Sequence, residues 1–209
     1  MLKYLSAASA ALALALAAAP AGAATFTGDY SVSFRNSDPG LVLQVQDLPG
    51  ALNFSLNNVG DTASAALFKV WTNEAAVNAD DLVSYPIAVT FGFTGPNAFG
   101  GSVNGHSQGA SALFGLFQNG SITWSGGGGT VLNFGNGGKL LVDLDDVVFN
   151  SGVLGLKGGV GHAATICAEF TLLQASVPEP GAWALMIVGF GLAGTAVRRR
   201  RVNLEPEAA

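Results

Sequence analysis

The sequence predicts an all-β protein, an antiparallel β-sandwich or jelly-roll-like domain, and three observations lead to that fold class. Short stretches in which apolar and polar residues alternate recur from residue 26 to residue 172. Clusters of Gly, Asn, Pro and Asp separate these stretches, as is typical of turns. Apart from residues 74–83, which allow at most a short helix, no window has the apolar spacing of an amphipathic helix.

Each predicted strand follows from a period of two, because successive side chains of a strand point to opposite faces of the sheet. In the last of them, every second residue from 164 to 172 is apolar. Asn119-Gly120 lies between apolar runs and predicts a two-residue hairpin turn, and residues 150–152 predict another turn. The eight or nine expected strands cover residues 26–34, 41–45, 68–72, 87–93, 113–117, 122–124, 131–134, 140–149 and 164–172.

The composition is acidic and poor in charge. The chain of 209 residues has a formal net charge of −5, and only 11% of its residues are charged. Between residues 24 and 176, four single basic residues stand among eleven acidic ones, which excludes the basic surface that nucleic-acid binding requires. Cys167 is the only cysteine, so an intramolecular disulfide framework and a cysteine-based zinc site are excluded. We expect no cofactor.

The N-terminus has the three parts of a secretory signal peptide. Lys3 supplies a positive charge, residues 5–19 form an Ala/Leu-rich apolar run, and Ala21-Gly22-Ala23 is a small-residue cleavage site. We expect residues 1–23 to be removed by cleavage after Ala23. The chain is therefore predicted to be exported.

The C-terminal part predicts a single transmembrane helix. Residues 181–197 carry no charge, and they lie between Glu179 and four consecutive arginines, residues 198–201. A helix of this length is about 25 Å long, the short end of what spans a bilayer. The arginines keep the far end in the cytoplasm, so both ends of the chain place the domain at residues 24–176 outside. The membrane contact through 181–197 is transient or permanent, depending on whether the tail at residues 177–209 is removed.

The tail resembles the PEP-CTERM sorting signal, in its PEP-x-x-W-A variety. The motif occupies residues 178–184, and residues 202–209 extend beyond the point where such signals often stop. The resemblance implies recognition and cleavage near Pro-Glu-Pro by an exosortase, a membrane-embedded sorting enzyme of Gram-negative bacteria that produce extracellular polysaccharide. The residues that carry the resemblance are Pro178, Glu179, Pro180, Trp183, Ala184, Gly189, Phe190, Gly191, Arg198, Arg199, Arg200 and Arg201.

One pattern points to an enzyme. Residues 105–109, Gly-His-Ser-Gln-Gly, match the G-x-S-x-G nucleophile elbow around Ser107, and acidic residues at 143–146 and then His162 follow in the order of a triad. A secreted serine hydrolase is therefore the alternative function. The elbow needs a buried strand before the serine and a helix after it, whereas residues 97–104 are too polar and Gly-rich for that strand. We expect residues 105–109 to be a Gly-rich loop or an edge strand, and the protein not to be an enzyme.

Other chemistry-bearing residues favour structural roles. Asp143, Asp145 and Asp146 could offer oxygens to Ca²⁺, but no EF-hand pattern is present and a solvated strand face explains them better, with Leu140, Val142 and Leu144 on the inner face. His106 and His162 stand alone, so no metal site is expected. Cys167 has no positive neighbour in sequence to activate it, and it is predicted to be a small packed or half-exposed residue. Trp71 and Trp124 could stack on carbohydrate, although core packing is the favoured role of both.

The sequence therefore predicts an exported, non-enzymatic protein of the cell surface or extracellular matrix. Its acidic β domain is expected to act in adhesion or in association with extracellular polysaccharide in a biofilm. The exosortase and the membrane are the other expected partners.

Overall fold

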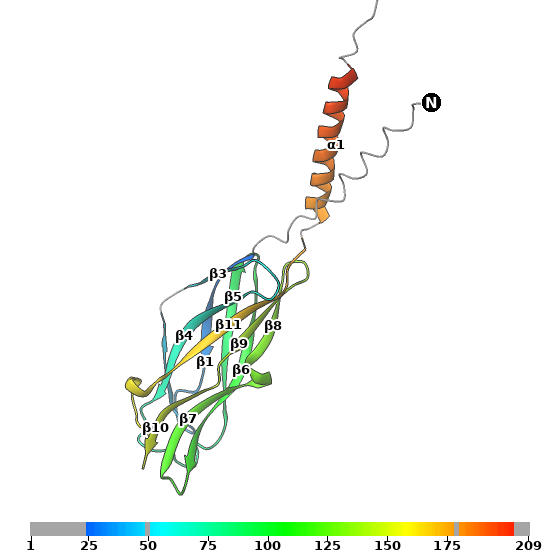
Figure 1. Ribbon diagram of the computed structural model, residues 1–209. Helices are drawn as coiled ribbons and strands as arrows, with labels where there is room; N and C mark the ends of the chain where they lie inside the picture. Colours follow the sequence, from blue (N-terminus) through cyan, green and yellow to red (C-terminus); the bar gives the residue numbers. More distant parts are fainter. Residues whose placement is uncertain (1–23, 49–50, 178–179, 203–209) are drawn as a thin grey trace, which may run out of the picture.

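The computed structural model describes residues 24–48, 51–177 and 180–202, and within them it shows two β-sheets packed face to face (Figure 1). The prediction of an antiparallel β fold is confirmed. The elements are β1 Ala24–Ser33, β2 Leu43–Asp47, β3 Leu52–Leu56, β4 Thr62–Thr72, β5 Tyr85–Gly95, β6 Phe99–Ala112, β7 Phe117–Trp124, η1 Ser125–Gly128, β8 Gly129–Phe134, β9 Gly138–Leu144, β10 Val147–Val153, η2 Val160–His162, β11 Ala164–Gln174 and α1 Pro180–Val202.

Every strand pair is antiparallel. One sheet has six strands in the order β10-β7-β6-β5-β1-β3, and the other has five in the order β2-β4-β11-β9-β8. The hairpin of β5 and β6 forms the centre of the first sheet, with Tyr85 opposite Ser107 and Phe93 opposite Phe99. In the second sheet β11 lies between β4 and β9.

The core lies between the sheets and is built from alternate residues, as the period of two predicts. On β11, Ile166, Ala168, Phe170 and Leu172 are buried, which confirms the face predicted for the last strand. Phenylalanines dominate the half of the core near the start of β1. The ring of Phe26 stacks on Phe54 at 5.3 Å between centroids and meets Phe134 edge to face at 5.1 Å. We call this half the aromatic end; its members are Phe26, Phe54, Phe91, Phe93, Phe99, Phe134 and Phe170.

The opposite half is closed by loops and buried polar side chains, and we call it the polar end. The Asn150 side chain is buried; its Oδ1 accepts from the Thr72 backbone N–H at 2.8 Å, and its Nδ2 donates to the carbonyls of Lys157 and Gly159. The Gln118 Oε1 accepts from the Val77 backbone N–H at 2.7 Å. These bonds satisfy backbone groups that loops cannot pair among themselves.

A turn closes the polar end between β6 and β7, where the sequence predicted a strand at 113–117. Residues 113–116 form this turn, and Leu113 and Phe114 have φ of 48° and 59°. The predicted turn at Asn119-Gly120 is also wrong, because both residues lie inside β7 opposite β6. Gly120 is there for packing, since a Cβ at this position would lie 2.4 Å from the Phe149 ring.

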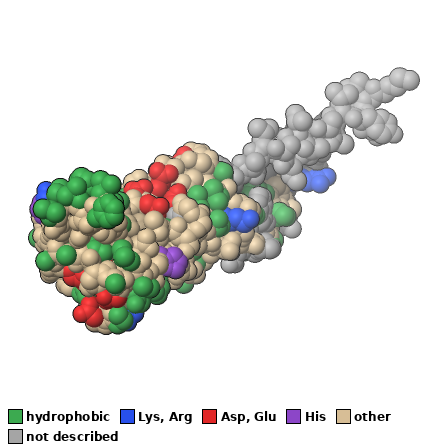
Figure 2. All heavy atoms as spheres, turned by 90° about the horizontal axis from the view of Figure 1, so that it is seen from below, with side chains coloured by type: hydrophobic (Ala, Val, Ile, Leu, Met, Phe, Trp, Pro, Cys, Tyr) green, Lys and Arg blue, Asp and Glu red, His purple; other side chains and the backbone are tan. Residues whose placement is uncertain are grey.

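Exposed apolar side chains gather at this turn. Leu113 and Phe114 are exposed, and the neighbouring Leu154 donates its backbone N–H to the Leu116 carbonyl at 2.7 Å. Seen from the end opposite α1, the surface shows hydrophobic side chains collected in patches (Figure 2). We call this surface the apolar tip; its residues are Leu113, Phe114, Leu116, Phe117, Val153 and Leu154.

Three further expectations are wrong because the strands are longer or shorter than the polarity suggests. Residues 99–112 form β6, a central strand of its sheet, although a Gly-rich loop or edge strand was expected at 105–109. Residues 140–149 are not one strand. The strand β9 ends at Leu144, and β9 and β10 belong to different sheets. Residues 150–152 belong to β10, where the register shifts, and are not a turn between strands.

The prediction missed β3 and the first half of β4, and residues 74–83 form bends and a turn in place of the short helix that the sequence allowed. The reason is local hydrogen bonding. The Asn78 Oδ1 accepts from the backbone N–H of Asp80 at 3.0 Å, which stabilises a turn and competes with a helix.

The helix α1 follows the sandwich and runs away from it in Figure 1. Its described side chains are exposed, among them Leu185 and Ile187. Within the part of the chain that the structure describes, no helix is long and apolar enough to cross a membrane, and the span predicted at 181–197 is not confirmed. The predicted signal peptide, with Ala21 and Ala23, lies outside the described residues.

Candidate functional site

The sorting segment begins where the folded domain ends. The Val177 backbone N–H donates to the Asn136 carbonyl, in the turn between β8 and β9, at 3.0 Å. Ser176 packs on the same turn, since a Cβ built on Gly135 would lie 3.1 Å from the Ser176 Cβ. The chain is thus held on the sandwich up to the residue before Pro178. Pro178 and Glu179 lie outside the described residues.

The rest of the sorting segment is helical. Helix α1 begins at Pro180, a residue that suits the first helical turn because its missing N–H needs no partner there. Trp183, Ala184 and residues 189–191 belong to its backbone, and residues 198–201 form its last turn. Basic side chains near a helix C-terminus interact favourably with the helix dipole.

Ser107 does not occupy a nucleophile elbow. It lies inside β6, paired with Tyr85 of β5 and Ile122 of β7, and only 1% of its surface is exposed. Its Oγ faces the Tyr85 carbonyl at 3.5 Å. An elbow needs an exposed serine on a sharp turn from a strand into a helix. Residues 105–109 therefore do not form the elbow that the alternative function, a serine hydrolase, requires.

Packing explains both glycines of that pattern. A Cβ on Gly105 would lie 2.6 Å from the Trp124 ring, so a side chain there would displace a core residue. A Cβ on Gly109 would lie 2.9 Å from a methyl group of Val77. The Gly109 backbone N–H also donates to the Asp81 carbonyl at 2.7 Å, which holds the connection between β4 and β5 against the sheet.

The residues that the hydrolase alternative needs as triad partners lie on other elements. His162 is exposed in η2, and His106 is exposed on β6, beside the buried Ser107. Asp143 lies on β9, in the other sheet from Ser107. Among the hydrogen bonds of the described residues, none joins the Ser107 side chain to a histidine or a carboxylate.

The acidic run at 143–146 has a structural role. The Asp146 Oδ1 accepts from the Trp124 backbone N–H at 2.7 Å, and the Trp124 Nε1 donates to the Asp145 carbonyl at 2.9 Å. The inner face predicted for Leu140, Val142 and Leu144 is confirmed, since all three are buried. In the described ranges, no three acidic, histidine or cysteine side chains are arranged to hold a metal ion.

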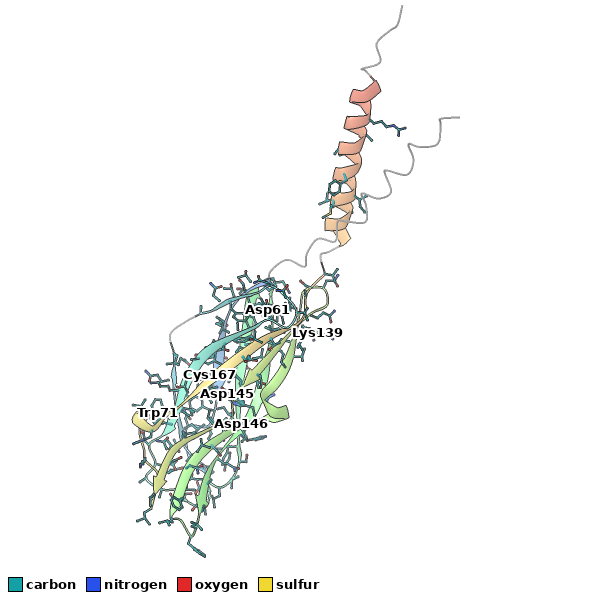
Figure 3. The ribbon with its side chains drawn as sticks, viewed as in Figure 1. Asp61, Trp71, Lys139, Asp145, Asp146 and Cys167 are labelled. Carbon is teal, nitrogen blue, oxygen red and sulfur yellow. The ribbon has the colours of Figure 1, made fainter. Side chains whose placement is uncertain are left out.

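Trp124 is 4% exposed, which confirms the core role predicted for it. Trp71 is half-buried near the C-terminal end of β4, well away from the labelled Asp61, which directly precedes that strand (Figure 3). Cys167 is a half-buried free thiol on β11, as predicted, and its carbonyl accepts from the Asp145 backbone N–H at 3.3 Å.

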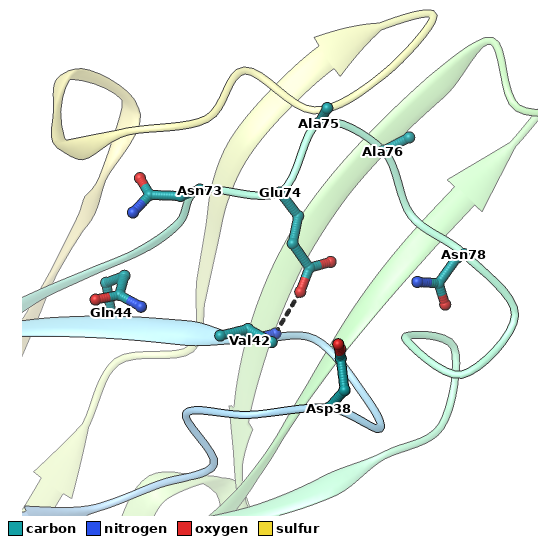
Figure 4. Close-up of a pocket in the computed structure, with 8 residues that line it drawn as sticks. All are labelled: Asp38, Val42, Gln44, Asn73, Glu74, Ala75, Ala76 and Asn78. Carbon is teal, nitrogen blue, oxygen red and sulfur yellow. Dashed lines mark hydrogen bonds between the residues drawn. The ribbon is translucent and has the colours of Figure 1, made fainter.

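The sequence did not predict the site that the fold assembles at the polar end. A pocket of about 510 Å³ opens between the connection from β1 to β2 and the connection from β4 to β5. Figure 4 shows the side chains of Asp38, Glu74 and Asn78 around it. We call it the acidic pocket; Gln44 and Asn73 also line it.

Carboxylates hold the two connections together. The Glu74 Oε1 accepts from the Val42 backbone N–H at 2.7 Å, and the Asp80 Oδ2 accepts from the Gly40 backbone N–H at 2.8 Å. The Asp81 Oδ2 accepts from the Asn78 backbone N–H at 2.8 Å. Each bond uses one oxygen of its carboxylate, so the second oxygen is free for another partner.

Two of those second oxygens are buried. Glu74 Oε2 and Asp81 Oδ1 are buried and accept no hydrogen bond from any other group among the described residues, and Asp81 as a whole is fully buried. Burial raises the pKa of Glu74 to about 7, and the Asp81 and Asp38 carboxylates add to the rise, against the lowering effect of the Val42 N–H. Near neutral pH, a protonated Glu74 donates a hydrogen bond to Asp81.

One feature of the sequence could have indicated the pocket. Residues 73–81 contain three acidic residues and two asparagines, in a chain of which only 11% is charged. Asp38 comes from a separate segment, which the pairing of β2 with β4 brings beside this loop. Only the topology shows that these carboxylates meet.

Comparisons with known proteins bear on the tail. The family model of the PEP-CTERM protein-sorting motif matches residues 176–201, which confirms the resemblance found in the sequence. No curated protein and no solved structure matches the chain.

Proposed function

Because the chain carries a PEP-CTERM sorting signal, we propose that it is an exported, non-enzymatic protein of the bacterial cell surface or extracellular matrix. The motif implies export and membrane-associated processing, with an exosortase as the kind of partner. We further propose an adhesive role for the β domain, in association with extracellular polysaccharide. The sorting motif, attached directly to the last strand of the sandwich, is the observation that carries the proposal.

The apolar tip supports the adhesive role. Exposed apolar patches on soluble domains commonly mark interaction surfaces. The tip lies at the polar end, whereas the tail leaves the sandwich beside Asn136, at the aromatic end. A domain held through its tail would therefore present the tip away from its attachment.

Two tail variants test the sorting. Replacing Pro178, Glu179 and Pro180 with Ala should leave a full-length chain attached to the cell, because the sorting enzyme no longer finds its motif. Replacing residues 198–201 with Ser should weaken retention and release uncleaved precursor. Mass spectrometry of the surface form reads both results. An intact Ala209 in the wild-type surface form, in a host that has an exosortase, would contradict processing.

Adhesion is tested separately from sorting. The double variant Leu113→Ser, Phe114→Ser should reduce attachment of producing cells, while the amount of surface-displayed protein stays unchanged. Val131→Ser is the matched control, since Val131 is also exposed but lies on β8. Binding of the purified chain to the producer's polysaccharide, measured by co-sedimentation, tests that association directly.

A further inference from the structure

We propose that Trp71 and the acidic pocket form a binding site for a neutral polysaccharide, with the indole ring as the surface on which one sugar ring stacks. The inference rests on the association with extracellular polysaccharide proposed above, and it names the part of the β domain that makes the contact. Three features carry it: the direction of Trp71, its place beside the pocket, and the polar groups that the pocket leaves open.

Trp71 points away from the core. Its neighbours on β4, Val70 and Thr72, are fully buried, and successive side chains of a strand point to opposite faces. Among the described residues, the Trp71 Nε1 has no hydrogen-bond acceptor, and it is not one of the buried unpaired nitrogen and oxygen atoms. The indole N–H is therefore open to solvent, unlike that of Trp124, which donates to the Asp145 carbonyl in the core.

The strand register places Trp71 at the rim of the acidic pocket. Gln44 of β2 lies directly opposite Trp71, and side chains paired in this way are neighbours on one face of the sheet, with Cβ atoms about 5 Å apart. Gln44 lines the pocket, as does Asn73, the second residue after Trp71. Figure 4 shows Gln44 and Asn73 on one side of the pocket and Asn78 on the other. The Trp71 ring thus borders a cavity of about 510 Å³, a size typical of small-ligand sites.

The open polar groups of the pocket match sugar hydroxyls. The amides of Gln44 and Asn73 form no hydrogen bond with other described side chains, and each amide both donates and accepts. Glu74 is occupied by the Val42 N–H and by Asp81, so Asp38 is the exposed carboxylate that can accept from a hydroxyl. The C–H face of a sugar ring is apolar and packs on an aromatic ring, while its hydroxyls reach the groups around it.

The charge around the site favours a neutral ligand. Asp38 is exposed in the pocket, and four basic residues stand among eleven acidic ones between residues 24 and 176. Lys69 adds a single positive charge on the outer face of β4, opposite Gln46. One lysine does not attract a polyanion to a domain of this net charge, so a polysaccharide rich in uronic acid should be repelled.

The test uses the full-length chain in a nonionic detergent and the producer's polysaccharide, separated by anion exchange into a neutral and an acidic fraction. We expect co-sedimentation with the neutral fraction, with little dependence on salt. Trp71→Ala should weaken this binding at least about tenfold, as the loss of a central aromatic contact commonly does, and Trp71→Phe should retain most of it. Asn73→Ala should weaken it several-fold, whereas Asn133→Ala, the same change on β8, should leave it unchanged.

The outcomes separate this site from the polysaccharide association itself. Equal binding of the neutral fraction by wild type and Trp71→Ala would overturn the site and leave the association standing. Binding of the acidic fraction alone would overturn the neutral ligand. Absence of binding to either fraction would contradict both the association and the site. If the melting temperature shows that Trp71→Ala is destabilised, Gln44→Ala and Asn73→Ala decide, and normal binding by both overturns the site.

Discussion

The two ends of the sandwich are stabilised by different interactions. At the aromatic end, seven phenylalanines pack ring against ring between the sheets, with Phe93 and Phe99 4.7 Å apart between centroids. At the polar end, backbone N–H groups donate directed hydrogen bonds to side-chain oxygens and hold the loops in place; the acceptors are Asn150, Gln118, Asp80 and Asp81. Hydrophobic burial is not directional, whereas each of these hydrogen bonds depends on one geometry. The aromatic end should therefore tolerate changes of shape, and the polar end should not.

The largest loss of stability is expected when a ring is removed from the aromatic end. Phe26→Ala should lower the free energy of unfolding by about 3–5 kcal/mol, because it leaves a cavity next to Phe54 and Phe134. Urea titration of the full-length chain measures it. Phe114→Ala is the control at the other end, where a fully exposed ring should contribute less than about 0.5 kcal/mol. A similar loss in both variants would remove the contrast between the ends.

At the polar end, Asn150→Ala should cost about 2–3 kcal/mol. The change leaves the Thr72 N–H and two carbonyls without partners in a buried site, and Asn150 has φ of 51°, where alanine is strained. Asn133→Ala, on the exposed face of β8, should change stability little.

Phe26→Leu should cost less than Phe26→Ala, whereas Asn150→Asp should still cost more than about 1 kcal/mol, the value of a single lost hydrogen bond. Equal tolerance at both sites would refute the distinction.

The pH dependence of stability sharpens the comparison. The pKa of Glu74 is raised to about 7 in the folded chain, above its ordinary value of 4.5, so the folded state binds the proton more tightly. The associated stability is complete below pH 4.5 and is lost as the pH rises through 7. Because Glu74 is only partly buried, we expect a loss of about 1 kcal/mol.

The measurement compares urea unfolding at pH 5 and pH 8 in EDTA. Glu74→Gln should flatten this pH dependence, since the amide cannot titrate, and Glu169→Gln should leave it in place. A wild-type chain that is more stable at pH 8 would show that Glu74 does not carry the raised pKa.

The same contrast explains how much of the fold could be predicted. The alternation on β5 and β11 predicted strands and buried faces, because a period of two is a local property of the chain. The positions of the turns could not be predicted in this way. Gly120 has the composition of a turn residue, but it lies inside a strand, where its missing side chain leaves room for the Phe149 ring. The end of β9 at Leu144 depends on which sheet each strand joins. The acidic pocket needed topology as well, since Asp38 and Glu74 meet only through strand pairing.

The smallest effect is expected at Ser107. The serine is buried between β5 and β7. Among the described residues, its hydroxyl donates only one hydrogen bond, a long one of 3.5 Å to the Tyr85 carbonyl. Ser107→Ala should therefore change the free energy of unfolding by less than about 1 kcal/mol. The wild-type chain should not react with a fluorophosphonate probe, because the hydroxyl is inaccessible and has no base within hydrogen-bond reach among the described residues. Gly105→Ala should cost far more than Ser107→Ala, because its Cβ meets the Trp124 ring at the core. Stoichiometric labelling of Ser107, lost in Ser107→Ala, would instead establish the hydrolase and show that the polar end opens in solution.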